Sequence, residues 1–98
     1  MKLTSKNRAK LKTLASREPA ILQVGKNGIG EQLIKQVDDA LEARELIKLT
    51  ILENAAETPQ EAAEALCEAT NSDIVQIIGR KLVLFRRNHA NPKINFKE

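Results

Sequence analysis

Short apolar runs alternate with helical patterns along this chain, and the alternation restricts its fold more than any other feature. Apolar residues at helical spacing predict helices over residues 6–16, 31–44 and 58 to about 71. Runs rich in β-branched residues predict strands over residues 20–24, 45–53, 73–78 and 82–85. The resulting order, α-β-α-β-α-β-β, predicts one compact α/β domain in which a four-stranded mixed sheet packs with three helices.

Capping and turn signals mark where several of these elements begin and end. Pro19 closes the first helix because it disfavours helical geometry at the residue before it. Thr58-Pro59-Gln60-Glu61 has the form of a capping box at the start of the third helix. Gly79-Arg80-Lys81 is predicted to be the turn between the last two strands. The residues expected to share core-facing surfaces are Ile47, Leu49 and Ile51 on the second strand, and Ala62, Ala63, Leu66 and Ala69 on the third helix.

Length and composition fit a single folded domain. A chain of 98 residues can bury about two-thirds of its unfolded surface in one core. All predicted elements fall within residues 1–88, whereas residues 89–98 lose periodicity around Pro92 and are expected to form a flexible C-terminal tail. Cys67 is the sole cysteine, and no signal sequence or membrane-spanning run is seen. We therefore expect a monomeric cytoplasmic protein with no membrane association.

Charge is strongly segregated along the sequence, although the formal net charge is only +3. Residues 1–30 carry seven bases and one acid, residues 31–73 three bases and eleven acids, and residues 74–98 six bases and one acid. Two basic ends therefore flank an acidic middle. A fold that gathers both ends on one face would attract a polyanion, although a solvated charge pattern with no partner is the alternative.

Three glycines and a lysine stand between the first predicted strand and the second helix, in Gly25-Lys26-Asn27-Gly28-Ile29-Gly30. Glycine at positions 25 and 28 permits positive φ and close approach of another backbone, and Asn27 tolerates a left-handed turn. Lys26 places a cation at the tip, and the unpaired amides of a helix that begins near Gly30 would attract an anion. This stretch is predicted to be a phosphate-binding loop.

Common nucleotide-binding and catalytic motifs do not fit the chain. The glycines are spaced GxxGxG rather than GxGxxG, and no Lys-Ser or Lys-Thr pair follows them as a P-loop requires. A single histidine, His89, and a single cysteine cannot build a catalytic triad or a structural zinc site, and the acids lie on predicted helix exteriors. We therefore predict a protein that is not an enzyme and that uses no metal or cofactor.

Further short motifs accompany the glycine loop. They are Leu3-Thr4 before the basic first helix, Val24 to Ile29, Ala40-Leu41-Glu42, Glu45 to Lys48, Val75 to Arg80, and Leu84-Phe85-Arg86. Between Leu3 and about Asn88 the chain thereby resembles the CRM domain (chloroplast RNA splicing and ribosome maturation) family, most closely its stand-alone bacterial YhbY-type members. The resemblance implies a fold like the C-terminal domain of a bacterial translation initiation factor, and a role near assembly of the large ribosomal subunit. One departure is Gly30, where the family usually has a threonine that would cap the second helix.

The leading hypothesis is a non-catalytic RNA-binding protein that engages ribosomal RNA or a precursor of the large subunit. A GxxG loop clamps the nucleic-acid backbone in KH-type modules, and basic side chains would extend that contact here. The predicted contact residues are Gly25, Lys26, Asn27, Gly28, Lys6, Lys10, Arg17, Arg80, Lys81 and Arg86. Because the chain lacks Trp and Tyr, reading of single strands by aromatic stacking is disfavoured.

Two other hypotheses compete with this one. The first is a protein-interaction module whose acidic middle, including Asp38, Asp39 and Glu42, docks on a basic ribosomal protein or assembly factor. The second and weaker one is a DNA-binding domain, which competition between duplex DNA and structured RNA would separate.

Overall fold

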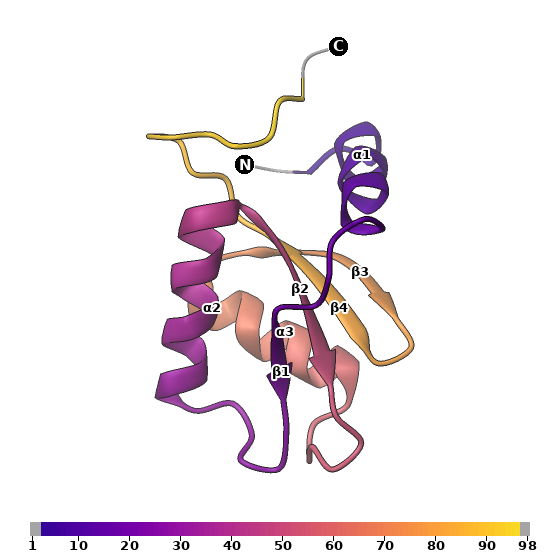
Figure 1. The fold of residues 1–98 in the computed structure, drawn as a ribbon, viewed down its shortest axis with the longest axis vertical. Coiled ribbons are helices and arrows are strands. Elements are labelled where there is room, and N and C mark those ends of the chain that lie inside the picture. The colour runs from indigo at the N-terminus through magenta and orange to yellow at the C-terminus, as the bar shows by residue number, and fades with distance from the viewer. Residues whose placement is uncertain (1–2, 97–98) are drawn as a thin grey trace.

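A computed structural model of the chain describes residues 3–96, and its elements follow the predicted order (Figure 1). The helices are α1 (Ser5–Ala15), α2 (Glu31–Arg44) and α3 (Pro59–Thr70), and the strands are β1 (Leu22–Val24), β2 (Leu46–Ile51), β3 (Asp73–Ile78) and β4 (Lys81–Phe85). The predicted bounds of α2 and β3 are confirmed, and those of the other elements differ by a few residues. The α1 helix starts at Ser5 because the Thr4 hydroxyl accepts the Asn7 amide hydrogen at 3.1 Å.

The four strands form one mixed sheet in the order β1-β2-β4-β3. β1 and β2 are parallel, whereas β4 runs antiparallel to both β2 and β3. Strand β1 is shorter than predicted because its ladder pairs only Leu22 to Val24 with Leu49 to Ile51. The predicted four-stranded α/β architecture is confirmed.

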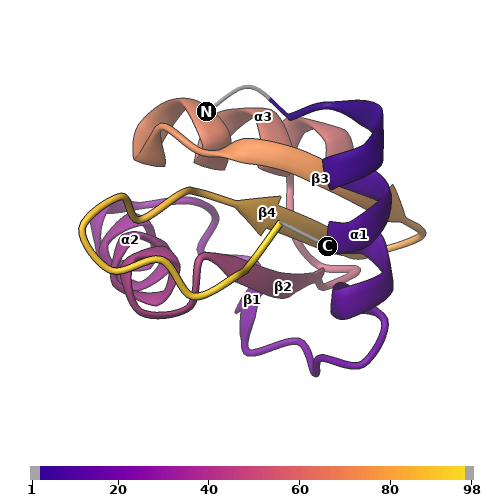
Figure 2. The same ribbon diagram turned by 90° about the horizontal axis from the view of Figure 1, so that it is seen from above.

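One face of the sheet packs against α2 and α3, while α1 lies on the opposite face, as Figure 2 shows. The β2 residues predicted to share a face, Ile47, Leu49 and Ile51, are buried on the α2 side with Val37 and Leu41 of α2. Since side chains alternate along a strand, the intervening residues of β2 point to the α1 side.

The α3 helix begins with the predicted capping box. The Thr58 hydroxyl accepts the Glu61 amide hydrogen at 3.1 Å, and the Glu61 carboxylate accepts the Thr58 amide hydrogen at 2.9 Å. The predicted inner face is corrected at its end, because Ala69 is exposed and Thr70 is buried instead. The buried stripe follows the i, i+4 step from Leu66, and the Thr70 hydroxyl stays satisfied by donating to the Leu66 carbonyl at 2.7 Å.

The α1 face of the sheet has its own apolar core. Leu11 and Ala15 of α1 are buried against Leu46, Val83 and Phe85 of the sheet. Strand β3 carries an irregularity in its register between Ile74 and Gln76, and the Arg8 guanidinium of α1 donates to both carbonyls at this site, those of Ile74 and Val75. These hydrogen bonds attach α1 to β3.

The segment predicted to be a flexible tail, residues 89–98, contacts this face through part of its length; residues 97 and 98 lie outside the described residues, and the flexibility of the segment stays a prediction. Ile94 and Phe96 join the α1-side core. The rings of Phe96 and Phe85 meet edge to face with centroids 5.7 Å apart, and the Arg87 guanidinium lies 5.2 Å from the Phe96 centroid.

Glu45 is the anchor of this C-terminal segment. It follows α2 with a φ of 65° and is fully buried. Its carboxylate accepts backbone hydrogens from Asn88, Lys93 and Ile94 at 2.7, 2.7 and 2.8 Å, and the Arg87 guanidinium lies 3.4 Å away. Burial would raise the pKa of Glu45, but the three amide donors and the Arg87 charge more than offset it and hold that pKa below its ordinary value.

Candidate nucleic-acid interface

The glycine loop forms a tight turn at the end of β1. The Gly28 amide donates to the Gly25 carbonyl at 3.0 Å, and Gly28 has a φ of 71°, which favours glycine. A Cβ at Gly25 would make an ordinary van der Waals contact with the Leu52 side chain at 3.4 Å, so the loop lies beside the residue after β2. Lys26 and Asn27 are exposed at the tip, and within residues 3–96 the Lys26 ammonium has no hydrogen-bond acceptor.

The α2 helix starts beside this loop without a side-chain cap. Gly30 is the N-cap residue, and it has no side chain that could accept a hydrogen bond from the amides of the first turn. A cleft of about 460 Å³ lies between the loop and the first turns of α2. Its polar lining includes Lys26, Asn27, the acid Glu31 and the three glutamines Gln23, Gln32 and Gln36. The exposed cation and the open helix N-terminus both favour an anion in this cleft.

A carboxylate behind the loop was not predicted from the sequence. A Cβ built on Gly28 would lie 3.3 Å from Oε2 of Glu57, and Oε1 of Glu57 is buried without a hydrogen-bond partner among the described residues. Glu57 belongs to the connection between β2 and α3, so no local pattern links it to the loop. An anion is therefore favoured on the Lys26 side of the turn and disfavoured on the Glu57 side.

The turn between β3 and β4 lies at the same end of the sheet as the glycine loop (Figure 1). The Arg80 guanidinium donates to the Ile51 carbonyl at 2.7 Å and to the Leu52 carbonyl at 2.8 Å. The Leu52 amide in turn donates to the Val24 carbonyl, the last residue of β1, at 2.8 Å. These bonds join the two turns through the end of β2, so the structure brings Arg80 and Lys81 to the end that carries Lys26.

The structure does not bring the α1 cations to the glycine loop. Figure 1 shows α1 beside the C-terminal segment, toward the opposite end of the long axis from the loop. Lys6 is exposed, whereas the Lys10 ammonium donates to the Asn95 carbonyl. Arg17 is exposed, but α1 ends at Ala15, so Arg17 lies beyond the helix that carries Lys6 and Lys10.

Arg86 was predicted to contact RNA, but the structure places its side chain in an internal network. Its guanidinium binds the Asp38 carboxylate at 2.5 Å, the Thr70 carbonyl at 2.9 Å and the Glu42 carboxylate at 3.3 Å. The side chain is only 19% exposed. Arg86 thus connects α2 to the end of α3, and we remove it from the candidate interface. No pattern in the sequence indicates these partners, since each is at least 16 residues away.

The described residues contain no group of histidine, cysteine and acidic side chains able to hold a metal ion. Cys67 is half-buried, and its burial, with the nearby Asp73 charge, raises the pKa of the thiol despite a hydrogen bond involving Ser72. His89 is exposed. Among the helices of residues 3–96, none has the length and apolar character required to cross a bilayer.

Fold and site together define a class of protein: a small α/β domain that gathers a glycine turn and cationic side chains at one end of a mixed sheet. More particularly, the chain belongs to the CRS1/YhbY (CRM) domain family, whose sequence model matches residues 3–86. The family resemblance stated from the sequence motifs is confirmed.

Comparison with known proteins gives relatives of similar length. The chain is 42% identical over 92 residues to the probable RNA-binding protein YqeI of Bacillus subtilis, covering 94% of this chain and 96% of that protein. It is 34% identical over 84 residues to an RNA-binding protein of Haemophilus influenzae, covering 86% of this chain and 85% of that protein. The solution structure of the hypothetical protein SAV1595 from Staphylococcus aureus has a TM-score of 0.79 at 46% identity, covering 96% of this chain and 98% of that one.

Proposed function

We propose that this chain is a non-catalytic RNA-binding protein that holds the RNA backbone at the glycine loop. The observation that carries the proposal is the exposed tip formed by Lys26 and Asn27 over the Gly25 to Gly28 turn, beside the uncapped start of α2. Lys81 lies at the same end of the sheet, next to the turn that contains Arg80, and adds a second cation there. Two relatives that match over most of their length carry names as RNA-binding proteins, which supports RNA as the polyanion.

A matched pair of lysine variants tests the loop. Lys26→Ala removes the cation at the tip, whereas Lys35→Ala removes an exposed cation on α2 whose ammonium pairs with Asp39 at 3.4 Å. We expect Lys26→Ala to weaken binding of structured RNA by about fivefold at low salt, and Lys35→Ala to change it by less than about twofold. Equal effects of the two variants would contradict a loop-centred site.

The salt dependence of binding tests the phosphate contacts. If about four phosphates of single-stranded RNA are neutralised, the logarithm of the affinity should fall with the logarithm of salt concentration at a slope near −3. Lys26→Ala should make that slope shallower by about 0.7. A slope near zero in the unaltered protein would contradict electrostatic binding of RNA.

Ribosomal RNA, or a precursor of the large subunit, is our proposed target, and we expect the protein to act as a cytoplasmic monomer. The choice of ribosomal RNA as the target rests on the CRM family resemblance rather than on the geometry. Crosslinking in cells followed by sequencing of the bound RNA tests it. We expect reads to concentrate on large-subunit ribosomal RNA, and reads spread evenly over messenger RNA would contradict that target.

The geometry gives less support to docking through the acidic middle. Two of its acids, Asp38 and Glu42, are already paired with Arg86, and Asp39 pairs with Lys35. These pairs leave less unbalanced negative charge on α2 than the sequence indicates. Charge reversal at Asp39 that abolished association with a basic ribosomal protein, while RNA binding stayed intact, would favour this alternative.

A further inference from the structure

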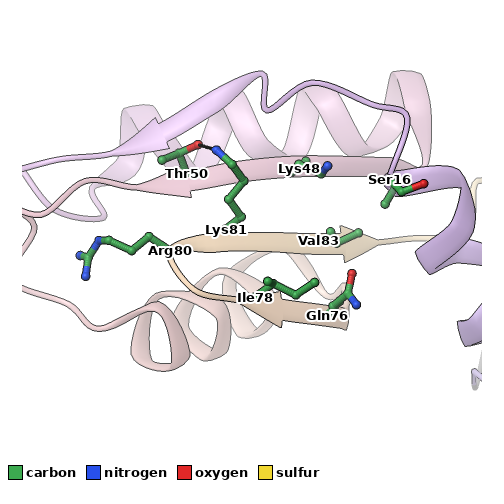
Figure 3. Close-up of a pocket in the computed structure, with 9 residues that line it drawn as sticks. Ser16, Lys48, Thr50, Gln76, Ile78, Arg80, Lys81 and Val83 are labelled. Carbon is green, nitrogen blue, oxygen red and sulfur yellow. Dashed lines mark hydrogen bonds between the residues drawn. The ribbon is translucent and has the colours of Figure 1, made fainter.

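The α1 face of the sheet is covered over only part of its length. Near α1 it is closed by Leu11, Ala15 and the C-terminal segment. Beyond the end of α1 the same face opens into a groove of about 480 Å³, which Figure 3 shows. Its lining comes from α1, its C-cap, three strands and the β3–β4 turn, namely Ala15, Ser16, Lys48, Thr50, Gln76, Ile78, Arg80, Lys81 and Val83.

The groove carries positive charge without a lining acid. Lys48 and Lys81 stand on adjacent strands, and no Asp or Glu lines the groove. The Lys81 ammonium donates to the Thr50 hydroxyl at 3.1 Å, whereas Lys48 is half-buried with no hydrogen-bond acceptor in the described part of the chain. Arg80 points away from the groove in Figure 3, because carbonyls at the end of β2 hold its guanidinium. Two lysines therefore remain for an anionic ligand.

The floor of the groove is apolar. Ile78 is 61% exposed, the one large hydrophobic residue of residues 3–96 that is exposed, and on β3 it pairs directly with Lys81 of β4. Val83 and Ala15 continue this floor toward α1. Around it stand the polar side chains of Gln76, Thr50 and Ser16, which both donate and accept hydrogen bonds. A flat apolar group with a polar edge and a neighbouring negative charge matches this lining, and a nucleotide has this combination.

We propose that this groove holds an unpaired nucleotide segment of the RNA bound at the glycine loop, so the inference rests on the proposed function. The base lies over Ile78 and Val83, and the flanking phosphates meet Lys48 and Lys81. A groove of this volume accommodates groups of small-molecule size, and not a duplex. The shared end of the sheet lets one RNA contact both places, through the Arg80 turn that lies between them.

Two RNAs with the same stem test the proposal, one closed by an unpaired loop and the other a blunt duplex. Ile78→Ser removes apolar surface from the floor without changing charge, and Lys48→Ala removes the unpartnered cation. We expect each variant to weaken binding of the looped RNA by about fivefold and binding of the duplex by less than about twofold. Because Ile78 is largely exposed, the fold should persist, and circular dichroism checks this.

Lys35→Ala and Lys26→Ala serve as controls. Lys35→Ala should leave binding of both RNAs unchanged. Lys26→Ala should weaken binding of both RNAs, since it acts at the loop. If Ile78→Ser and Lys48→Ala leave the affinity for both RNAs unchanged, or weaken binding of both RNAs equally, the groove holds no unpaired nucleotide. The proposal for the glycine loop is unaffected by that result. If the unaltered protein binds neither RNA, the proposed function itself fails. An acidic peptide could also compete with the looped RNA for the protein. If Lys48→Ala abolishes that competition and Ile78→Ser leaves RNA affinity unchanged, the groove binds a protein segment instead.

Discussion

The carboxylate of Glu57 lies against Gly28, so that a Cβ at Gly28 would come within 3.3 Å of Glu57 Oε2. A negative charge thus stands directly behind the turn that we propose to hold RNA phosphates. In the proposed complex this carboxylate would lower the affinity for RNA, because like charges repel at short distance. It also means that Gly28→Asp would combine backbone strain, a second carboxylate and lost binding, so that variant does not isolate the contact with RNA.

We expect Glu57→Gln to strengthen RNA binding by about twofold to threefold at low salt, with the gain shrinking as salt rises. Glu68→Gln makes the same charge change at an exposed site on α3, and should alter affinity much less. Fluorescence anisotropy with one labelled RNA measures both variants. Weaker binding by Glu57→Gln would mean that the carboxylate positions the loop rather than repelling the ligand.

The glycines at 28 and 30 should respond oppositely to substitution. Gly28→Ala places a side chain at a φ of 71° and against Glu57, so we expect the free energy of unfolding to fall by about 1 kcal/mol. Gly30→Ser adds a hydroxyl at an N-cap that has no side-chain bond, where a Cβ meets open space. A gain of about 0.5 to 1 kcal/mol is expected there, from the cap and from reduced freedom of the unfolded chain.

Urea denaturation monitored by circular dichroism gives both changes. A stabilising Gly28→Ala would show that the turn relaxes out of positive φ without cost. A destabilising Gly30→Ser would show that the start of α2 needs glycine for a reason other than capping.

Arg86→Ala separates a structural arginine from one that binds RNA. Because the guanidinium holds the Asp38 carboxylate and the Thr70 carbonyl from a mostly buried position, we expect the free energy of unfolding to drop by about 2 kcal/mol. RNA affinity of the folded variant should change by less than about twofold. Arg86→Lys should recover only part of the stability, since a lysine cannot reproduce the fork of bonds. A large loss of affinity with unchanged stability would return Arg86 to the interface.

The order and identity of the helices and strands could be predicted because their signals are local. The bounds of α2 follow from apolar spacing, and the start of α3 follows from the Thr58 and Glu61 capping box. The position of the glycine loop between a strand and a helix was predicted for the same reason. Even the inner face of β2 could be assigned, since side chains alternate along any strand.

What the sequence did not indicate depends on contacts between distant residues. Arg86 pairs with Asp38, Glu45 binds the backbone of Ile94, and Glu57 reaches Gly28, all across 29 or more residues. A periodic pattern holds no information about such partners. The contacts of residues 89–96 were not predicted for the same reason, because the buried acid that accepts the Lys93 and Ile94 amide hydrogens lies in another part of the chain. The same limit explains why Lys6 and Lys10 were predicted to contact RNA together with the loop, since a helical pattern does not place the helix on the sheet.

Acid should weaken the fold through Glu45. Its pKa is lowered on folding, so its contribution to stability is fully present above its ordinary value in the unfolded chain and is lost as the pH falls through its lower value in the folded protein. We expect Glu45→Gln to reduce the free energy of unfolding at neutral pH by about 2 kcal/mol, because a neutral amide replaces a charged acceptor of three backbone amides. The variant should also flatten the decline in stability as the pH falls below the ordinary pKa of a glutamate. Urea unfolding at a series of pH values compares the two proteins, and parallel pH curves would show that Glu45 does not carry the acid sensitivity.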